Sequence, residues 1–258
     1  MSRFAIPCVL LLALVAAAAP QDKKPPEKKD PPKLLYAIPL VVKPGEKQKV
    51  AVRGKSLATA TEVKVTGADG AKVKFVAARA AAPPNNYPAE RLGDSEVELE
   101  LELPKDAKPG EVKLVAVGPA GESAPYTLLL RDGTQVVAEK EPNDGFDQPQ
   151  TLAVPCAVEA SIKGERDVDV FKIEGKKGDT LRIEVQAARY GSPVDAVCVL
   201  YDSSRAVVAS ASESPGRPDP VLTATLPRDG AYLLSVQDAN DLGGNQFGYR
   251  LVVTRPEK

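Results

Sequence analysis

The sequence contains no histidine among its 258 residues. Histidine is the general base of Ser-His-Asp and Cys-His catalysis and a common zinc ligand, so its absence excludes those hydrolase mechanisms and every histidine-ligated zinc site. Reactions that need only carboxylates, and metal sites built from oxygen atoms, remain open. The simpler interpretation is a protein without catalytic function, and we expect that the chain is not an enzyme.

Aromatic residues are also scarce: tryptophan is absent, and Phe, Trp and Tyr together make up 5% of the chain. The hydrophobic cores must therefore be built from valine, leucine and alanine. Carbohydrate-binding surfaces commonly use exposed aromatic rings, for which only Tyr87, Tyr190 and Tyr232 are candidates, and the last lies in an alternating strand pattern. The formal net charge of −1 gives no sign of a nucleic-acid-binding surface, and we expect no nucleic-acid partner.

The N-terminus has the three parts of a secretory signal peptide: a basic residue at Arg3, an apolar run over residues 4–18, and small residues at 16–19. The run is too short to span a membrane comfortably. We expect a signal peptide at residues 1–19, an exported protein (periplasmic, cell-surface or extracellular), and no transmembrane segment after cleavage. Residues 20–33 contain five prolines and eight charges, which is typical of an extended linker.

Three cysteines occur, and Cys8 would leave with the signal peptide. In an oxidising compartment, Cys156 and Cys198 would close a disulfide loop of about 42 residues. Two separate buried thiols that pack as small apolar side chains are the alternative. The sequence leaves both open.

Short alternating segments separated by turns dominate the rest of the chain, and no helical pattern of useful length occurs. The clearest segment is residues 96–103, in which four glutamates alternate with Val97, Leu99, Leu101 and Leu103. This period of two predicts an antiparallel strand with one buried and one solvated face. We expect an all-β protein with two β-sandwich domains, at residues 34–131 and 146–258, joined by an acidic linker at 132–145.

The acidic linker and a second acidic pair nearby are the strongest candidate site. Carboxylates and an amide oxygen are the ligands that a hard cation such as Ca²⁺ selects. Acidic segments are also common in solvated linkers, which is the alternative interpretation. The candidate calcium ligands are Glu139, Glu141, Asn143, Asp144, Asp167 and Asp169.

Two other acidic positions were weighed against simpler roles. Asp195 follows Pro193 and Val194, where a catalytic carboxylate is conceivable, but a carboxylate that holds the turn before the next strand is the more economical interpretation. The Gly- and Asp-rich loop at residues 238–245 has a composition that fits either a cation site or an ordinary surface hairpin, and we favour the hairpin.

In the first half, the order of a Pro-Gly turn, a strand and the element Gly54-Lys55-Ser56-Leu57 resembles the immunoglobulin-like domains of bacterial surface proteins (the IPT/TIG type). This resemblance covers about 30 residues. It implies an immunoglobulin-like sandwich for the N-terminal domain.

From about residue 139 to 255, the chain resembles the bacterial pre-peptidase C-terminal domain, a jelly-roll-like module of secreted peptidases. The matching segments occur in order: Glu141-Pro142-Asn143-Asp144, residues 164–171, Gly178-Asp179-Thr180-Leu181, and residues 191–195, 219–222 and 229–232. The resemblance implies calcium ligands at the six positions named above. The chain departs from the pattern at residues 209–213, where many relatives have an acidic turn, and this puts a second ion or ligand contact there in doubt.

These inferences predict an exported, non-catalytic binding, adhesion or targeting protein whose calcium-stabilised linker fixes the angle between two domains. Its partner would be an envelope or extracellular protein or polysaccharide. An accessory protein that assists the secretion, folding or substrate targeting of a secreted peptidase is the alternative. A hydrolase that uses carboxylates, with Asp167 and Asp195 as candidates, is a third class.

Overall fold

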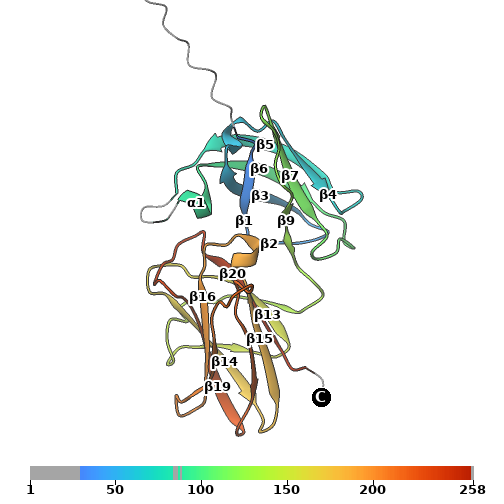
Figure 1. Ribbon diagram of the computed structural model, residues 1–258. Coiled ribbons are helices and arrows are strands. Elements are labelled where there is room, and N and C mark those ends of the chain that lie inside the picture. Colours follow the sequence, from blue (N-terminus) through green and yellow to red (C-terminus); the bar gives the residue numbers. More distant parts are fainter. Residues whose placement is uncertain (1–29, 84–86, 88, 257–258) are drawn as a thin grey trace, which may run out of the picture.

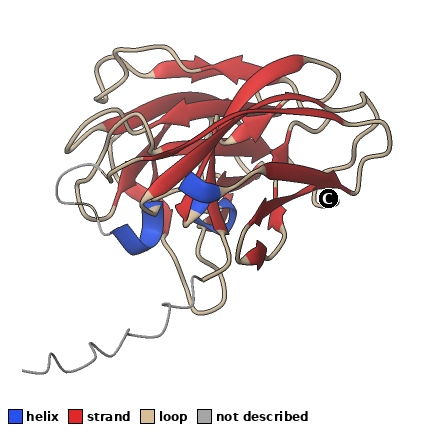
Figure 2. Ribbon diagram, turned by 90° about the horizontal axis from the view of Figure 1, so that it is seen from above, coloured by secondary structure: helices blue, strands red, loops and turns tan. Residues whose placement is uncertain are grey.

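The computed structural model describes residues 30–83, 87 and 89–256, which form two β-sandwiches arranged end to end (Figure 1). The expected signal peptide and most of the Pro- and Lys-rich linker lie outside the described residues. Strands dominate the structure, and the helical elements are single turns (Figure 2): η1 (Leu57–Thr59), α1 (Ala89–Leu92) and η2 (Ala188–Tyr190). The predicted all-β class is confirmed. Within the described part of the chain, no helix has the length and apolar character to cross a membrane.

The first sandwich pairs a four-stranded sheet, of order β1-β3-β6-β5, with a smaller sheet of order β4-β7-β8, in which β9 also pairs with β7; β2 and β10 form a short parallel pair. Its strands are β1 (Lys33–Ile38), β2 (Val41–Val42), β3 (Lys47–Lys55), β4 (Glu62–Thr66), β5 (Lys72–Ala80), β6 (Ser95–Glu102), β7 (Lys113–Gly118), β8 (Gly121–Glu122), β9 (Tyr126–Thr127) and β10 (Leu129–Leu130).

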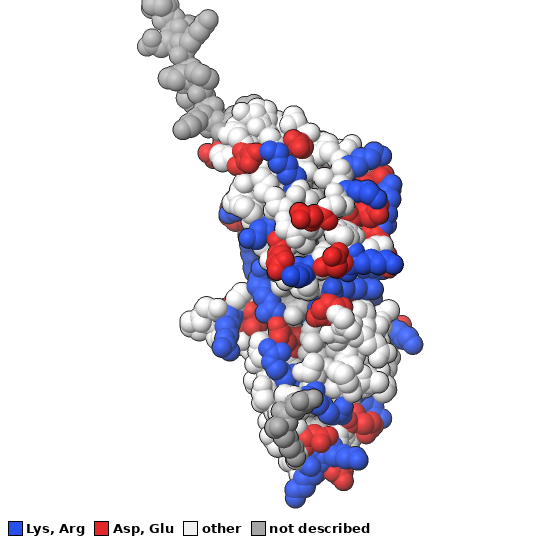
Figure 3. All heavy atoms as spheres, turned by 90° about the vertical axis from the view of Figure 1, so that its right-hand side faces the viewer, with Lys and Arg blue, Asp and Glu red and all other residues white. Residues whose placement is uncertain are grey.

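Strand β6 shows how the sequence pattern creates the first sandwich. Val97, Leu99 and Leu101 are buried, while the alternating glutamates stay partly exposed on the outer face. Because β3 and β5 flank β6, their lysines and arginines lie beside these glutamates. Rows of acidic and basic side chains therefore cover this sandwich (Figure 3).

The second sandwich consists of two five-stranded sheets, of orders β11-β13-β20-β15-β18 and β12-β14-β19-β16-β17. Its strands are β11 (Val136–Ala138), β12 (Gln150–Leu152), β13 (Cys156–Ser161), β14 (Val168–Gly175), β15 (Thr180–Gln186), β16 (Ala196–Tyr201), β17 (Val207–Ala211), β18 (Val221–Thr225), β19 (Gly230–Asp238) and β20 (Gly248–Thr254). Alternation again defines the buried face: Leu181, Ile183 and Val185 of β15 are fully buried. Cys156 and Cys198 are both buried and free.

The two sandwiches each have a hydrophobic core, and the first sandwich contributes several side chains to the core of the second. Tyr36, Leu40 and Leu129 of the first sandwich belong to the buried cluster of the second. Tyr87 also joins this cluster, where its hydroxyl donates to the carbonyl of Pro193 at 2.9 Å. Its ring packs edge-on against Phe247, with centroids 5.3 Å apart.

Hydrogen bonds and ion pairs reinforce this junction. The hydroxyl of Tyr126 donates to the carbonyl of Tyr190 at 2.7 Å. Arg131 makes a bidentate pair with Glu159 of β13, at 2.5 and 2.7 Å. Gly191 lies so close to the first sandwich that a Cβ atom there would be 1.7 Å from the carbonyl oxygen of Leu35. The relative placement of the two sandwiches is therefore fixed by packing.

Candidate metal centre

The candidate ligands come from three neighbouring segments of the second sandwich. The segment between β11 and β12 carries Glu139, Glu141, Asn143 and Asp144, the turn between β13 and β14 carries Asp167, and Asp169 lies in β14. Backbone contacts hold the segments together, because the Val170 N–H donates to the carbonyl of Asn143 at 2.8 Å. The two acidic groups of the sequence thus meet in space.

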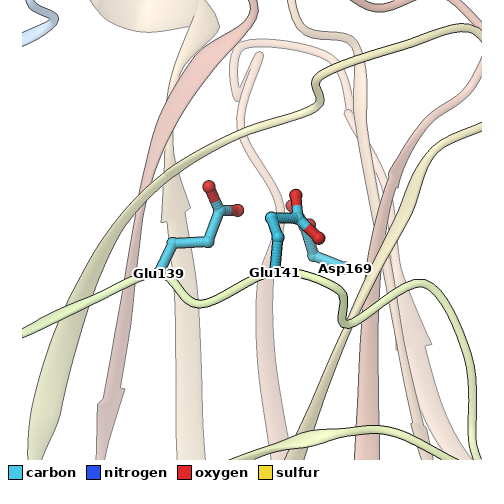
Figure 4. A group of neighbouring side chains, drawn as sticks. All are labelled: Glu139, Glu141 and Asp169. Carbon is cyan, nitrogen blue, oxygen red and sulfur yellow. The ribbon is translucent and has the colours of Figure 1, made fainter.

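The five acidic candidates form two overlapping groups. Carboxylate oxygens within 4.8 Å of one another come from Glu139, Glu141 and Asp169 in one group, and from Glu141, Asp144 and Asp167 in the other. In Figure 4, Glu139 and Glu141 project from the same side of their segment, and Asp169 lies behind Glu141. Glu141 belongs to both groups and is therefore the central residue of the site.

Two buried side chains of the site have polar atoms without a protein partner. Asn143 is fully buried, and neither its Oδ1 nor its Nδ2 has a hydrogen-bond partner among the described residues. Asp169 is fully buried as well; its Oδ2 accepts a hydrogen bond from the Tyr249 hydroxyl at 2.5 Å, but its Oδ1 has no such partner. A buried polar atom without a partner is costly, so unsatisfied oxygens beside a group of carboxylates suit a cation.

Burial dominates the electrostatics of the site. It raises the pKa of Asp169 to about 8, although the bond from Tyr249 opposes this. Burial also raises the pKa of Glu139 and of Asp167. Carboxylates that are buried beside one another resist ionisation, and a bound cation would remove this resistance.

Glu141 behaves differently from its neighbours. Burial acts to raise its pKa, but hydrogen bonds from Lys163 and from the Asn143 N–H outweigh burial and lower it. The Lys163 ammonium is 2.8 Å from Glu141 Oε1 and 3.2 Å from Glu139 Oε2. Glu141, Asp144 and Asp167 also line an open surface cleft together with Lys163, through which an ion from solvent can reach the site.

The acidic segment does not lie between the domains, where the sequence analysis expected a linker. Residues 136–138 form β11, which pairs in parallel with β13 and so belongs to the second sandwich before Glu139 is reached. The chain crosses between the sandwiches earlier, at Arg131 and Asp132, which are held by ion pairs to Glu159 and Arg250. The sequence could not show this, because β11 gains its partner from a strand about 20 residues later.

The other acidic positions have structural roles. Asp195 donates its backbone N–H to the buried carboxylate of Asp238 at 2.8 Å. Asp238 also accepts from the N–H groups of Asn240 and Leu242, so it organises the hairpin at residues 238–245. The turn before β16 is thus held by Asp238 rather than by Asp195.

Two residues that the sequence analysis missed contact the site, Lys163 and Tyr249. Tyr249 lies in β20, about 80 residues from Asp169, and no local pattern indicates this contact. Lys163 precedes Asp167 by four residues, but lysines are common on both sides of the acidic segments. Of the three tyrosines considered as carbohydrate platforms, Tyr87 and Tyr232 are buried, and Tyr190 is half-buried.

No family model matches the chain. Over 144 residues, or 54% of its length, the chain is 32% identical to a probable subtilase-type serine protease of Deinococcus radiodurans. The aligned part covers 20% of that protein, so the chain spans about a fifth of this curated relative.

Two solved structures are also similar to parts of the chain. One is the pre-peptidase C-terminal domain of a collagenase from Bacillus anthracis, with a TM-score of 0.35 and 17% identity, covering 45% of this chain and 100% of that one. The other is PliG of Aeromonas hydrophila, a periplasmic inhibitor of g-type lysozyme, with a TM-score of 0.32 and 12% identity, covering 47% of this chain and 98% of that one.

Proposed function

We propose that this chain is an exported, non-catalytic binding protein whose acidic segment binds calcium. The observation that carries the proposal is the pair of buried side chains with unpartnered atoms, Asn143 and Asp169, within a group of five carboxylates. A merely solvated acidic segment would keep its polar atoms in water. Calcium takes six to eight oxygen ligands at flexible geometry, which suits mixed carboxylate and amide donors.

The ion would be held by the six residues Glu139, Glu141, Asn143, Asp144, Asp167 and Asp169. Bound calcium would supply the positive charge that permits the buried carboxylates to ionise. It would connect the segment after β11 to the turn before β14, and so stabilise the second sandwich next to the domain junction. In this proposal the ion fixes a segment within one sandwich, while packing fixes the angle between the two.

Thermal unfolding tests the calcium site directly. We expect calcium to raise the melting temperature of the protein relative to a chelator, because a ligand that binds only the folded state stabilises it. The double variant Glu141→Ala/Asp144→Ala should lose this increase. The matched control Glu98→Ala/Glu100→Ala removes two carboxylates from β6 of the first sandwich and should retain it. If the melting temperature of the wild type does not change in millimolar calcium, the acidic segment is not a calcium site.

The binding partner is proposed as a protein or polysaccharide of the cell envelope or its surroundings. The absence of histidine and the use of the Asp195 and Asp238 carboxylates in hydrogen bonds within the hairpin support a protein without catalysis. A pull-down from envelope extracts with the calcium-loaded protein tests this proposal. A bound polymer or surface protein would support the binding role.

An accessory role for a secreted peptidase is the second candidate. The observation that favours it is the 32% identity to part of a probable subtilase-type serine protease. In this case the chain would assist the secretion, folding or substrate targeting of a peptidase. The same pull-down distinguishes the two candidates, because a co-purifying peptidase would support the accessory role instead.

A further inference from the structure

A lysine already occupies the position that a cation would need. Lys163 lies just after β13, and its ammonium contacts two of the proposed ligands, Glu139 and Glu141, at 3.2 and 2.8 Å. Its backbone N–H donates to Oδ2 of a third, Asp167, at 2.5 Å. One residue therefore contacts three of the six proposed ligands, through its main chain on one side and its side chain on the other.

The hydrogen bonds of the individual carboxylate oxygens show where the Lys163 ammonium lies relative to Glu139 and Glu141. Glu139 accepts the Ser161 N–H at Oε1, at 3.4 Å, and contacts Lys163 through Oε2. Glu141 accepts the Asn143 N–H at Oε2, at 3.1 Å, and contacts Lys163 through Oε1. In both glutamates, the oxygen that is not bonded to the backbone is the one that faces the ammonium.

We propose that Lys163 is a built-in counter-cation, which pairs with Glu139 and Glu141 in the metal-free protein and moves into solvent when calcium binds. This inference rests on the proposed calcium function. An ion at about 2.3–2.6 Å from the free oxygens of Glu139 and Glu141 would lie within a few ångströms of the ammonium, where the two positive charges repel each other.

The Lys163 side chain can leave without disturbing the fold. It is 49% exposed, so its ammonium is already partly hydrated and has a short path to water. Its backbone N–H would remain bonded to Asp167, so the turn between β13 and β14 would keep its shape. The lysine thus offsets part of the repulsion among the carboxylates of the metal-free site, and it raises the calcium concentration at which the site fills.

Calcium affinity measured by isothermal titration calorimetry tests the competition. We expect Lys163→Met to bind calcium about two- to fivefold more tightly than the wild type, because an exposed ion pair that must be broken is worth up to about this factor. The matched control is Lys64→Met. Lys64 is 45% exposed and pairs with Glu122 at 2.6 Å in the first sandwich, so this variant removes the same charge far from the site and should bind as the wild type does.

Two further measurements separate displacement from a general effect of charge. In chelator, Lys163→Met should melt at a lower temperature than the wild type, and in saturating calcium the difference should disappear. Acetylation of Lys163, followed by mass spectrometry, should become faster when calcium is added to the wild type. Acetylation of Lys64 serves as the internal control and should not change.

The results distinguish this inference from the function on which it rests. A wild type that binds calcium, together with a Lys163→Met variant of equal or weaker affinity, would overturn the displacement and leave the calcium site standing. An unchanged acetylation rate at Lys163 would do the same. If neither the folded wild type nor the folded variant binds calcium, both proposals fail together.

Discussion

The outer face of β6 and the segment after β11 are both rich in acidic residues, yet their electrostatics are opposite. On β6, the glutamates at 96, 98, 100 and 102 each face basic side chains of the neighbouring strands, among them Lys47, Lys72, Lys74 and Arg79. The hydrogen bond with Arg79 lowers the pKa of Glu98, and the hydrogen bond with Lys47 lowers the pKa of Glu100. These carboxylates are satisfied by the protein itself.

In the second sandwich, three of the five clustered acids have a raised pKa because burial outweighs their partners. One ammonium, that of Lys163, bridges Glu139 and Glu141. The difference teaches that the number of acidic residues says little about a site. What matters is the ratio of buried carboxylates to available cations. This ratio is low in the charge ladder, by which we mean the glutamates of β6 and their basic partners on β3 and β5, and high at a place that can accept an ion.

The largest expected effect follows from removing the buried carboxylate of Asp169. Asp169→Ala leaves the buried Tyr249 hydroxyl without its acceptor, and should lower the free energy of unfolding by about 1–3 kcal/mol in chelator. It should also abolish the response to calcium. Asp169→Asn keeps an acceptor for Tyr249 and cannot ionise, so in chelator it should be at least as stable as the wild type while still losing that response. Urea unfolding with and without calcium measures both effects, and a calcium response that survives Asp169→Ala would contradict the site.

The pH dependence of stability, compared between the wild type and Asp169→Asn, tests the electrostatics of the site further. The pKa of Asp169 is about 8 when folded and 3.8 ordinarily, so between these values the folded protein holds a proton that the unfolded chain has released. In chelator, this group's contribution to stability should therefore be complete below about pH 4 and lost as the pH rises towards 8, with a slope of at most about 1.4 kcal/mol per unit. Asp169→Asn should lack this contribution. Parallel pH profiles for the two proteins would show that Asp169 ionises normally.

A smaller effect is expected at the domain junction. Arg250 is 1% exposed and pairs with Asp132 at 2.6 and 3.3 Å. Asp132→Ala would leave this guanidinium with Gln186 as its one side-chain partner among the described residues. It should lower the free energy of unfolding by about 1 kcal/mol, less than for a fully buried pair because Asp132 is 42% exposed. The double variant Asp132→Ala/Arg250→Met should recover part of the loss in urea unfolding. A single variant as stable as the wild type would show that the pair contributes nothing.

The stability that Asp132 contributes at this junction should depend on pH in the opposite direction to that of Asp169. Burial acts to raise the pKa of Asp132, but hydrogen bonds from Arg250 and Thr134 outweigh it and lower the pKa to about 2. The stability that Asp132 contributes is therefore present above about pH 4 and is lost as the pH falls towards 2.

The smallest effect is expected on the charge ladder. Glu98→Gln removes one of the two partners of Arg79, which keeps its contact with Glu96. Because Glu98 is 40% exposed and solvent screens its pair with Arg79, the free energy of unfolding should not change measurably, and the calcium response should remain. Chemical denaturation at low and high salt checks this expectation. A measurable loss would mean that the ladder is a cooperative network rather than a set of exposed pairs.

The sequence predicted the strands well, because a strand with one buried and one solvated face shows an alternation of apolar and polar residues that is visible within a short segment. The alternation in β6 and β15 survives in the structure as alternating burial. The five acidic candidates also meet as expected, on segments that bracket β12 and β13. The contact between Asp169 and Tyr249, and the pairing of Lys163 with two glutamates, depend on tertiary placement and leave no local signature.

The junction between the sandwiches was the hardest part to predict. Tyr36 alternates in β1 like any strand residue, but its ring is buried in the core of the other sandwich. Sequence periodicity reports that a side chain is buried, not which core contains it. The sequence therefore suggested an inter-domain linker at residues 132–145, although the pairing of β11 places residues 136–138 in a sheet of the second sandwich.

The packing at the junction has a consequence for how the molecule can be divided. Tyr36, Leu40 and Leu129 contribute to the hydrophobic cluster of the second sandwich, and Gly191 meets the backbone at Leu35 with no room for a side chain. Separating the chain near residue 131 would expose both sides of this contact to water. The two halves resemble independent modules in the sequence, but each would lose buried contacts if it were expressed alone or moved into another protein.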